Sequence, residues 1–170
     1  MRPYERTSLT PLNKVLDIRA DANAPLNIDL LTGIGLEMPK LAANLTMMFN
    51  EVDFLDRFAA AATAGFKGVE YLFPYDYDKN LLREKLQQNK LTQVLHNLPA
   101  GNWGAGERGI GCHPDRVAEF EAGVDKAIDY ATALGCKQLN CLAGVRPPGL
   151  DPNDARETFV KNLQYAAPRF

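Results

Sequence analysis

KGVEYLFPYDYDKNLLREKLQQNKLTQVLHNLP, residues 67–99, decides the fold because it contains one complete structural repeat. The segments KGVEYLF (67–73) and LTQVLHNLP (91–99) are short apolar runs bounded by turn residues, so each predicts a strand. Leu82 and Leu86 lie one helical turn apart between these runs and predict a short helix. Two strands joined through a helix predict a parallel pair that is covered on one face.

The same alternation extends in both directions along the chain. LAANLTMMF (41–49) and CKQLNCLAG (136–144) predict a first and a fourth strand, and Met47 and Met48 are expected to pack in the core. The predicted helices run from Asn50 to Gly65, across Leu82 and Leu86 to a left-handed Asn89, from His113 and Pro114 to Gly135, and from Asp151 through Ala166.

The spacing of the predicted strands indicates the architecture. They start near residues 41, 67, 91 and 136, which is a roughly even repeat interrupted by one long loop. This spacing favours a βα-barrel over a doubly wound sheet. A whole barrel typically needs about 250 residues. The predicted fold class is therefore α/β, with about four parallel βα units that form half of a TIM barrel.

The composition and net charge of the chain limit the kinds of molecule that we expect it to bind. The 170 residues are 46% hydrophobic and 24% charged, which is typical of a globular domain. Nineteen basic and 21 acidic residues give a net charge of -2, so nothing favours nucleic acid or an acidic membrane surface as a partner. The chain has no apolar stretch of membrane-spanning length and no secretory leader pattern, so we expect a cytoplasmic location. Three cysteines without C-x-x-C spacing are expected to be free thiols.

Residues 1–37 differ from the rest in composition. They contain three prolines, scattered charges and one apolar patch, NIDLLTGIGL. We predict an N-terminal extension that is either disordered or not native, with Met38 as the natural start and residues 38–170 as the partial barrel. Peptides detected upstream of Met38 by mass spectrometry of the native protein would contradict the second alternative.

Gly104-Ala-Gly106-Glu-Arg-Gly109 matches the G-x-G-x-x-G pattern of a dinucleotide-binding loop. In such a loop the pyrophosphate meets the N-terminus of a helix that begins within the motif. Here the strand breaks at Pro99 and the next helix begins only near Pro114, so the pattern argues against a nucleotide site. The glycines instead favour a long loop that folds back over a pocket at the carboxyl ends of parallel strands.

Polar residues at the predicted strand ends and in this loop form the candidate substrate pocket. Arg108 would hold a carboxylate through two parallel hydrogen bonds, and Trp103 would be an apolar lid that excludes water, with Glu107 beside them. Two alternatives stay open: Arg108 pairs with Glu107 or a neighbour at the surface, or His96 is merely hydrogen-bonded in the core. The candidate substrate-binding residues are Glu70, His96, Asn97, Trp103, Arg108 and Asn140.

The residues supply no complete catalytic set. The chain has two histidines, no H-x-x-x-H or E-x-x-H pair and no G-x-S-x-G nucleophile motif. We therefore assign no catalytic residue and no metal ligand from the sequence.

Three segments resemble a known family. MPKLAANLTMMFNEVDFLDRFAAAATAGFKGVEYLFPYDYD (38–78), HNLPAGNWGAGERGIGCHPDR (96–116) and LNCLAG (139–144) are similar, in the same order, to the N-terminal half of the hydroxypyruvate isomerase family. That family is part of the xylose isomerase-like TIM-barrel superfamily. The resemblance covers about three quarters of the chain.

The resemblance implies interconversion of hydroxypyruvate and tartronate semialdehyde. A carboxylate base would take a proton beside the carbonyl, and a divalent metal such as Mg²⁺ or Mn²⁺ would stabilise the enediol. The metal ligands and paired catalytic glutamates of this superfamily lie on strands five to eight. No position of this chain matches them, so it is not expected to hold the metal by itself.

Other readings remain open beside this one. The chain would be a related sugar or 2-oxo-tetronate isomerase or epimerase, or a non-catalytic half-barrel that binds a small acid or assembles with a partner. A metal-dependent endonuclease is disfavoured by the near-neutral charge. A half-barrel would also expose strand edges, through which two copies would form a homo-oligomer.

Overall fold

The structure is a computed structural model that describes residues 39–170. The expectations for residues 1–37 and for Met38 lie outside the described residues. Within the described part, no helix is both long and apolar enough to cross a membrane.

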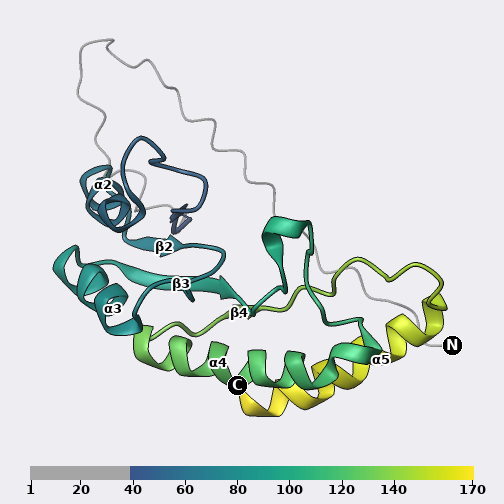
Figure 1. The fold of residues 1–170 in the computed structure, drawn as a ribbon. Coiled ribbons are helices and arrows are strands. Elements are labelled where there is room, and N and C mark those ends of the chain that lie inside the picture. Colours follow the sequence, from purple (N-terminus) through teal and green to yellow (C-terminus); the bar gives the residue numbers. More distant parts are fainter. Residues whose placement is uncertain (1–38) are drawn as a thin grey trace, which may run out of the picture. The chain divides into compact units, whose positions relative to one another are not determined.

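Four parallel strands form the centre of the structure, in the order β1-β2-β3-β4 (Figure 1). This arrangement of consecutive parallel neighbours is that of successive strands in a TIM barrel, so the predicted α/β partial barrel is confirmed. The strands are β1 (Ala42–Asn44), β2 (Gly68–Glu70), β3 (Thr92–Asn97) and β4 (Leu139–Asn140).

A helix follows each strand, as the sequence pattern predicts. The helices are α2 (Arg57–Thr63), α3 (Lys79–Gln88), α4 (Val117–Leu134) and α5 (Pro152–Ala166). Four short 3₁₀ segments complete the chain: η1 (Phe54–Asp56), η2 (Trp103–Ala105), η3 (Pro114–Arg116) and η4 (Ala167–Arg169).

Local chemistry fixes most helix ends. The Asp78 carboxylate accepts hydrogen bonds from two backbone N–H groups at the start of α3, and Asp151 accepts one at the start of α5. Gly135 ends α4 with a φ of 66°, a conformation that suits glycine. The predicted end of the helix at Asn89 is wrong in detail, because Asn89 has a φ of -97° and Lys90 takes the left-handed position at 54°.

The first strand and its helix differ from the prediction. The strand ends at Asn44, whose carbonyl accepts the N–H groups of Met47 and Met48 and so turns the chain. Both methionines are exposed, at 69% and 38%, so the prediction that they pack is wrong. Asn50 does not cap a helix, because its side chain donates to the carbonyl of Met47; helical structure begins at Phe54.

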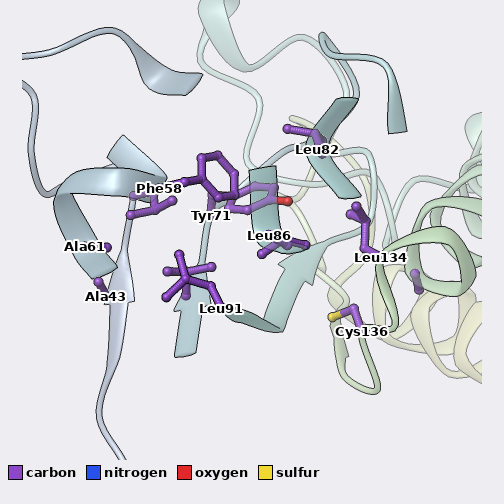
Figure 2. Close-up of a cluster of buried hydrophobic side chains, with 12 residues drawn as sticks. Ala43, Phe58, Ala61, Tyr71, Leu82, Leu86, Leu91, Leu134 and Cys136 are labelled. Carbon is purple, nitrogen blue, oxygen red and sulfur yellow. The ribbon is translucent and has the colours of Figure 1, made fainter. Parts of the chain in front are cut away.

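The core lies between one face of the sheet and the helices (Figure 2). The strand residues Ala43 and Val69, and Tyr71 directly after β2, are buried there with Phe58 of α2 and Leu82 of α3. A second cluster surrounds the chain after β3 and consists of Leu98, Ile110, Phe120, Val124, Ala127 and Ala166. Because successive side chains of a strand point to opposite faces, the neighbours of Ala43 and Val69 point away from this core.

Candidate functional site

Each of the four strands ends in a polar residue, and these residues pair across the sheet. Asn44 and Glu70 lie side by side in the β1–β2 ladder, and Asn97 and Asn140 do so in the β3–β4 ladder. The Asn44 side-chain amide donates to Glu70 Oε1 at 3.0 Å, and that of Asn140 donates to Asn97 Oδ1 at 3.0 Å. We call these four residues the polar row.

The polar row lies where parallel α/β sheets bind ligands. Its members are the last residues of their strands, and binding sites of βα-barrels lie at the carboxyl ends of the strands. Ala43 and Val69 pack on the helix side of the sheet. Because successive side chains of a strand point to opposite faces, Asn44 and Glu70 point away from the helices. Asn97 is 5% exposed, and its carbonyl also accepts from the Tyr75 hydroxyl at 2.6 Å. The row therefore offers a fixed set of amide and carboxylate groups.

The glycine loop, residues 101–109, follows β3 at the polar-row end of the sheet and carries an aromatic and a cationic side chain. The Trp103 ring packs edge to face on Phe73, three residues after the end of β2, with the ring centroids 5.1 Å apart. The Arg108 guanidinium lies 4.1 Å from the centroid of the Trp103 ring and donates to the carbonyls of Trp103 and Glu107. Trp103 keeps 36% of its surface exposed.

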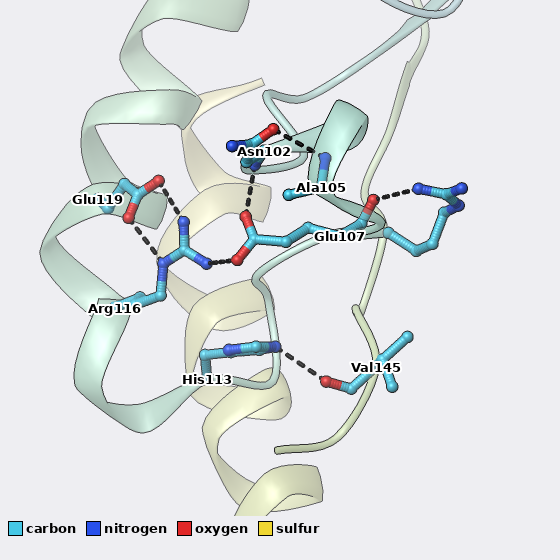
Figure 3. Close-up of polar contacts among 8 residues, drawn as sticks. Asn102, Ala105, Glu107, His113, Arg116, Glu119 and Val145 are labelled. Atoms are coloured by element: carbon cyan, nitrogen blue, oxygen red, sulfur yellow. Dashed lines mark hydrogen bonds and ion pairs between the residues drawn. The ribbon is translucent and has the colours of Figure 1, made fainter. Parts of the chain in front are cut away.

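The Glu107 carboxylate points to Arg116 in η3 and does not bind the Arg108 guanidinium, which reaches only the Glu107 backbone carbonyl. One carboxylate oxygen accepts from Arg116 Nη1 at 2.6 Å, and the other accepts from the Asn102 backbone N–H (Figure 3). The bond to Arg116, followed by that to Asn102, holds the pKa of Glu107 below its usual range. Arg116 also binds Glu119 through two hydrogen bonds. The alternative in which Arg108 pairs with the Glu107 carboxylate is therefore wrong.

The far end of the loop is tied to the segment after β4. Gly109 forms an antiparallel bridge with Ala143, and the Cys112 N–H donates to the Ala143 carbonyl at 2.7 Å. Gly109 has a φ of 114°, and a Cβ there would overlap the backbone of Leu142. Gly109 therefore serves the close approach of two chain segments.

His96 lies on the other face of the sheet from its neighbour Asn97. It is 1% exposed, its ring packs edge to face on Tyr75, and neither ring nitrogen has a hydrogen-bond partner. Burial lowers the pKa of His96 to about 4, an effect that the backbone of Ala127 in α4 offsets only in part. The imidazole is therefore neutral near pH 7.

The structure thus divides the six predicted site residues into groups. Glu70, Asn97 and Asn140 belong to the polar row, Trp103 and Arg108 lie in the glycine loop, and His96 is buried on the helix-covered face of the sheet. The sequence analysis did not predict Asn44 as a site residue. It took polar residues at the ends of predicted strands as candidates, and it placed the end of the first strand after Asn44. It also missed Phe73, for which the sequence holds no comparable signal.

The described residues do not fit a metal centre. Within residues 39–170, no three His, Cys, Asp or Glu side chains gather closely enough to hold an ion. The polar row contains a single carboxylate, Glu70, which already accepts from Asn44, whereas divalent cations are held by several oxygen ligands. The three cysteines are free, and burial raises the pKa of Cys141 to about 11, so this thiol is protonated near pH 7.

Comparison with known proteins defines the class. The chain belongs to the xylose isomerase-like TIM-barrel family, whose sequence model matches residues 58–170. A crystal structure of AP endonuclease, family 2, from Brucella melitensis has a TM-score of 0.75 and 52% identity, and the match covers 78% of this chain and 51% of that one. D-allulose 3-epimerase from Methylomonas sp., solved in complex with D-allulose, has a TM-score of 0.52 and 25% identity, covering 67% and 40%.

Two curated relatives carry names that state an enzymatic activity. Hydroxypyruvate isomerase of Escherichia coli is 55% identical over 130 residues, which are 76% of this chain and 50% of that protein. A 2-oxo-tetronate isomerase of Pectobacterium atrosepticum is 53% identical over 133 residues, which are 78% of this chain and 51% of that protein. The family predicted from the motifs is confirmed, and the chain spans about half the length of the curated relatives it matches.

Proposed function

We propose that this chain forms the substrate-binding wall of an isomerase that interconverts hydroxypyruvate and tartronate semialdehyde. The observation that carries the proposal is the polar row at the strand ends, together with a loop after β3, at the same end of the sheet, that presents Trp103 and Arg108. The relatives named hydroxypyruvate isomerase and 2-oxo-tetronate isomerase support the same substrate class, a short hydroxy or oxo acid. The free cysteines are in keeping with a cytoplasmic location for this activity.

The chemistry of the substrate matches the groups on this wall. Among the described residues, Arg108 uses only Nη1, for backbone carbonyls, so Nε and Nη2 are available to a carboxylate. The amides of the polar row can donate to a carbonyl oxygen and accept from a hydroxyl. Trp103 and Phe73 give an apolar edge that excludes water from the reacting carbon.

The isomerisation removes a proton from the hydroxyl-bearing carbon, forms an enediol and returns a proton to the former carbonyl carbon. The family resemblance implies a divalent metal and a carboxylate base for these steps. The described residues do not fit the metal, so we assign them no step through it, and we name no described residue as the base.

A binding measurement tests the wall directly. We expect titration calorimetry to show tartronate, an unreactive three-carbon analogue, binding to the chain. Arg108→Met should weaken this affinity about tenfold or more, because a hydrogen bond to a charged group contributes about 1.5–3 kcal/mol. Arg83→Met, which removes an exposed arginine from α3, is the matched control and should bind as the wild type does. Absence of tartronate binding, or equal affinities for all three proteins, would contradict the proposal.

A non-catalytic binding role is the second candidate, and the single carboxylate of the polar row favours it. Proton NMR of hydroxypyruvate with the purified chain and Mg²⁺ or Mn²⁺ separates the two. Tartronate semialdehyde would appear for an isomerase, whereas a binding protein would bind tartronate and leave hydroxypyruvate unchanged. Parallel reactions with a 2-oxo-tetronate and a free ketose would identify the preferred substrate.

A further inference from the structure

The Glu107 carboxylate connects two parts of the chain that are otherwise separate. Its Oε1 binds Arg116 in η3, the 3₁₀ turn that leads into α4, and its Oε2 binds the Asn102 N–H at the beginning of the glycine loop. The side chains of Glu107 and Arg116 are only 31% and 27% exposed. One carboxylate therefore joins the loop to the beginning of α4.

The absence of a side chain at Gly101 leaves room for the Glu107 carboxylate in the glycine loop. Gly101 has a φ of 77°, and a Cβ there would overlap Glu107 Oε2. The missing side chain of Gly101 lets the carboxylate reach the Asn102 N–H. The Glu107 contact therefore requires glycine at position 101. An ordinary exposed ion pair does not restrict which residues lie beside it.

The partner of Glu107 is itself held in place. Arg116 Nε and Nη2 bind both oxygens of Glu119 at 2.8 and 2.7 Å, which leaves Nη1 directed at Glu107. The turn of α4 that follows is anchored in the core through Phe120, which is 3% exposed. Arg116 is therefore a fixed point against which the loop is positioned.

The two functional side chains of the loop depend on the same contact. Arg108 directly follows Glu107, and its Nη1 donates to the Glu107 carbonyl at 2.7 Å. Trp103 directly follows Asn102, and its ring is covered by the Arg108 guanidinium. A displacement of Glu107 would therefore move both side chains.

We propose that Glu107 is a positioning residue, whose carboxylate, bound between Arg116 and the Asn102 N–H, holds Trp103 and Arg108 in place at the polar-row end of the sheet before a substrate binds. The part of this inference that concerns substrate rests on the proposed function. A loop that is already ordered loses less conformational entropy on binding, so the contact would raise affinity for the acid without touching it.

Tryptophan fluorescence tests the inference without any activity measurement, because Trp103 is the single tryptophan of the chain. In Glu107→Gln, the amide NH2 would face one of the two donors, Arg116 Nη1 or the Asn102 N–H, so one of the two contacts would be lost. We expect a red-shifted emission maximum and about a twofold increase in acrylamide quenching. Glu157→Gln is the matched control, since it also removes a carboxylate from an ion pair, with Lys161 on the exposed face of α5, but touches neither the loop nor Arg116, and it should leave the emission unchanged.

Two outcomes would overturn the inference: emission from Glu107→Gln that equals the wild type, or the same shift in Glu157→Gln. Far-UV circular dichroism establishes that each variant is folded. If Glu107→Gln does not fold, hydrogen exchange on the wild type replaces it, with slow exchange expected at the Asn102 amide and fast exchange contradicting the contact. Gly101→Ala approaches the same contact from its other side and should shift the Trp103 emission in the same direction.

Tartronate binding separates this inference from the proposed function. If the wild type binds tartronate and Glu107→Gln binds it with equal affinity, Glu107 has no positioning role. We expect the variant to bind about tenfold more weakly. If the wild type binds no tartronate, the proposed function fails, whereas the fluorescence result still decides whether Glu107 holds the loop.

Discussion

Burial controls the chemistry of single residues in this protein, and His96 shows it most directly. Its imidazole has no hydrogen-bond partner and a pKa of about 4 in the folded protein, against about 6.5 in an unfolded chain. Between these values the unfolded chain binds more protons. The free energy of unfolding should therefore fall by about 2 to 3 kcal/mol as the pH drops from 7 to 4.5.

Urea unfolding at pH 7 and 4.5 checks this prediction. His96→Leu should lose less stability over this interval than the wild type, because the titrating group is gone. His113→Gln removes the chain's other histidine, which is half-buried, and should keep the wild-type loss. Equal losses in His96→Leu and the wild type would contradict the assigned cause.

Alanine substitutions at two loop glycines separate the cost of a steric overlap from the cost of a left-handed backbone conformation. Gly106 and Gly109 have φ values of 94° and 114°, but a Cβ at Gly106 meets open space, whereas one at Gly109 overlaps the backbone of Leu142. Gly106→Ala should cost about 1–2 kcal/mol in unfolding free energy from the left-handed conformation alone. Gly109→Ala should cost clearly more by urea unfolding; similar losses would show that the close approach is easily relieved.

At the scale of elements, the helix starts differ in whether a side chain caps them. Asp78 accepts from the N–H groups of Asn80 and Leu81 at the start of α3, whereas Asp53 makes no such bond before η1. Asp78→Ala should lower the free energy of unfolding by about 1 kcal/mol. Asp53→Ala should change it by less than half as much in the same urea titration, and the reverse order would contradict the assignment.

The elements also show what local patterns predict well. The buried face of α4 and the apolar runs of the strands could be predicted, because a buried face requires apolar residues at regular spacing within a short stretch of sequence. The strands themselves are shorter than their apolar runs, since hydrogen bonds such as those to the Asn44 carbonyl end β1 before the hydrophobic residues end. Strand ends therefore could not be read from hydrophobicity.

At the scale of the whole molecule, residues 39–170 leave both edges of their sheet without a partner strand. Among the described residues, β1 pairs only with β2 and β4 only with β3, and an unpaired parallel edge is a template for association. We therefore expect the chain to form a homodimer through these edges. Analytical ultracentrifugation should show a concentration-dependent dimer, and a monomer at all concentrations would contradict this.

Matched leucine variants locate the interface. Leu41 precedes β1 directly and is 69% exposed, whereas Leu81 lies on α3 and is 36% exposed. Leu41→Glu should weaken the dimer because it places a charge beside the edge strand, and Leu81→Glu should leave it intact. Equal weakening by both would indicate association through the helices instead.

The sequence by itself determined the alternation of strands and helices, their order in the fold and the polar character of the strand ends. These features follow from composition and spacing within short windows, which is why they could be predicted. It also carried motifs specific enough to identify the family, which the comparisons confirm.

Only the tertiary structure decided which side chains meet. Asn44 bonds to Glu70 across 26 positions and Asn140 to Asn97 across 43, and no local pattern selects such partners. The same holds for Glu107, whose carboxylate binds Arg116 although Arg108 is adjacent in sequence. The physical reason is that strand register and helix packing fix side-chain directions, and direction determines whether a polar group finds a partner or, as with His96, is buried without one.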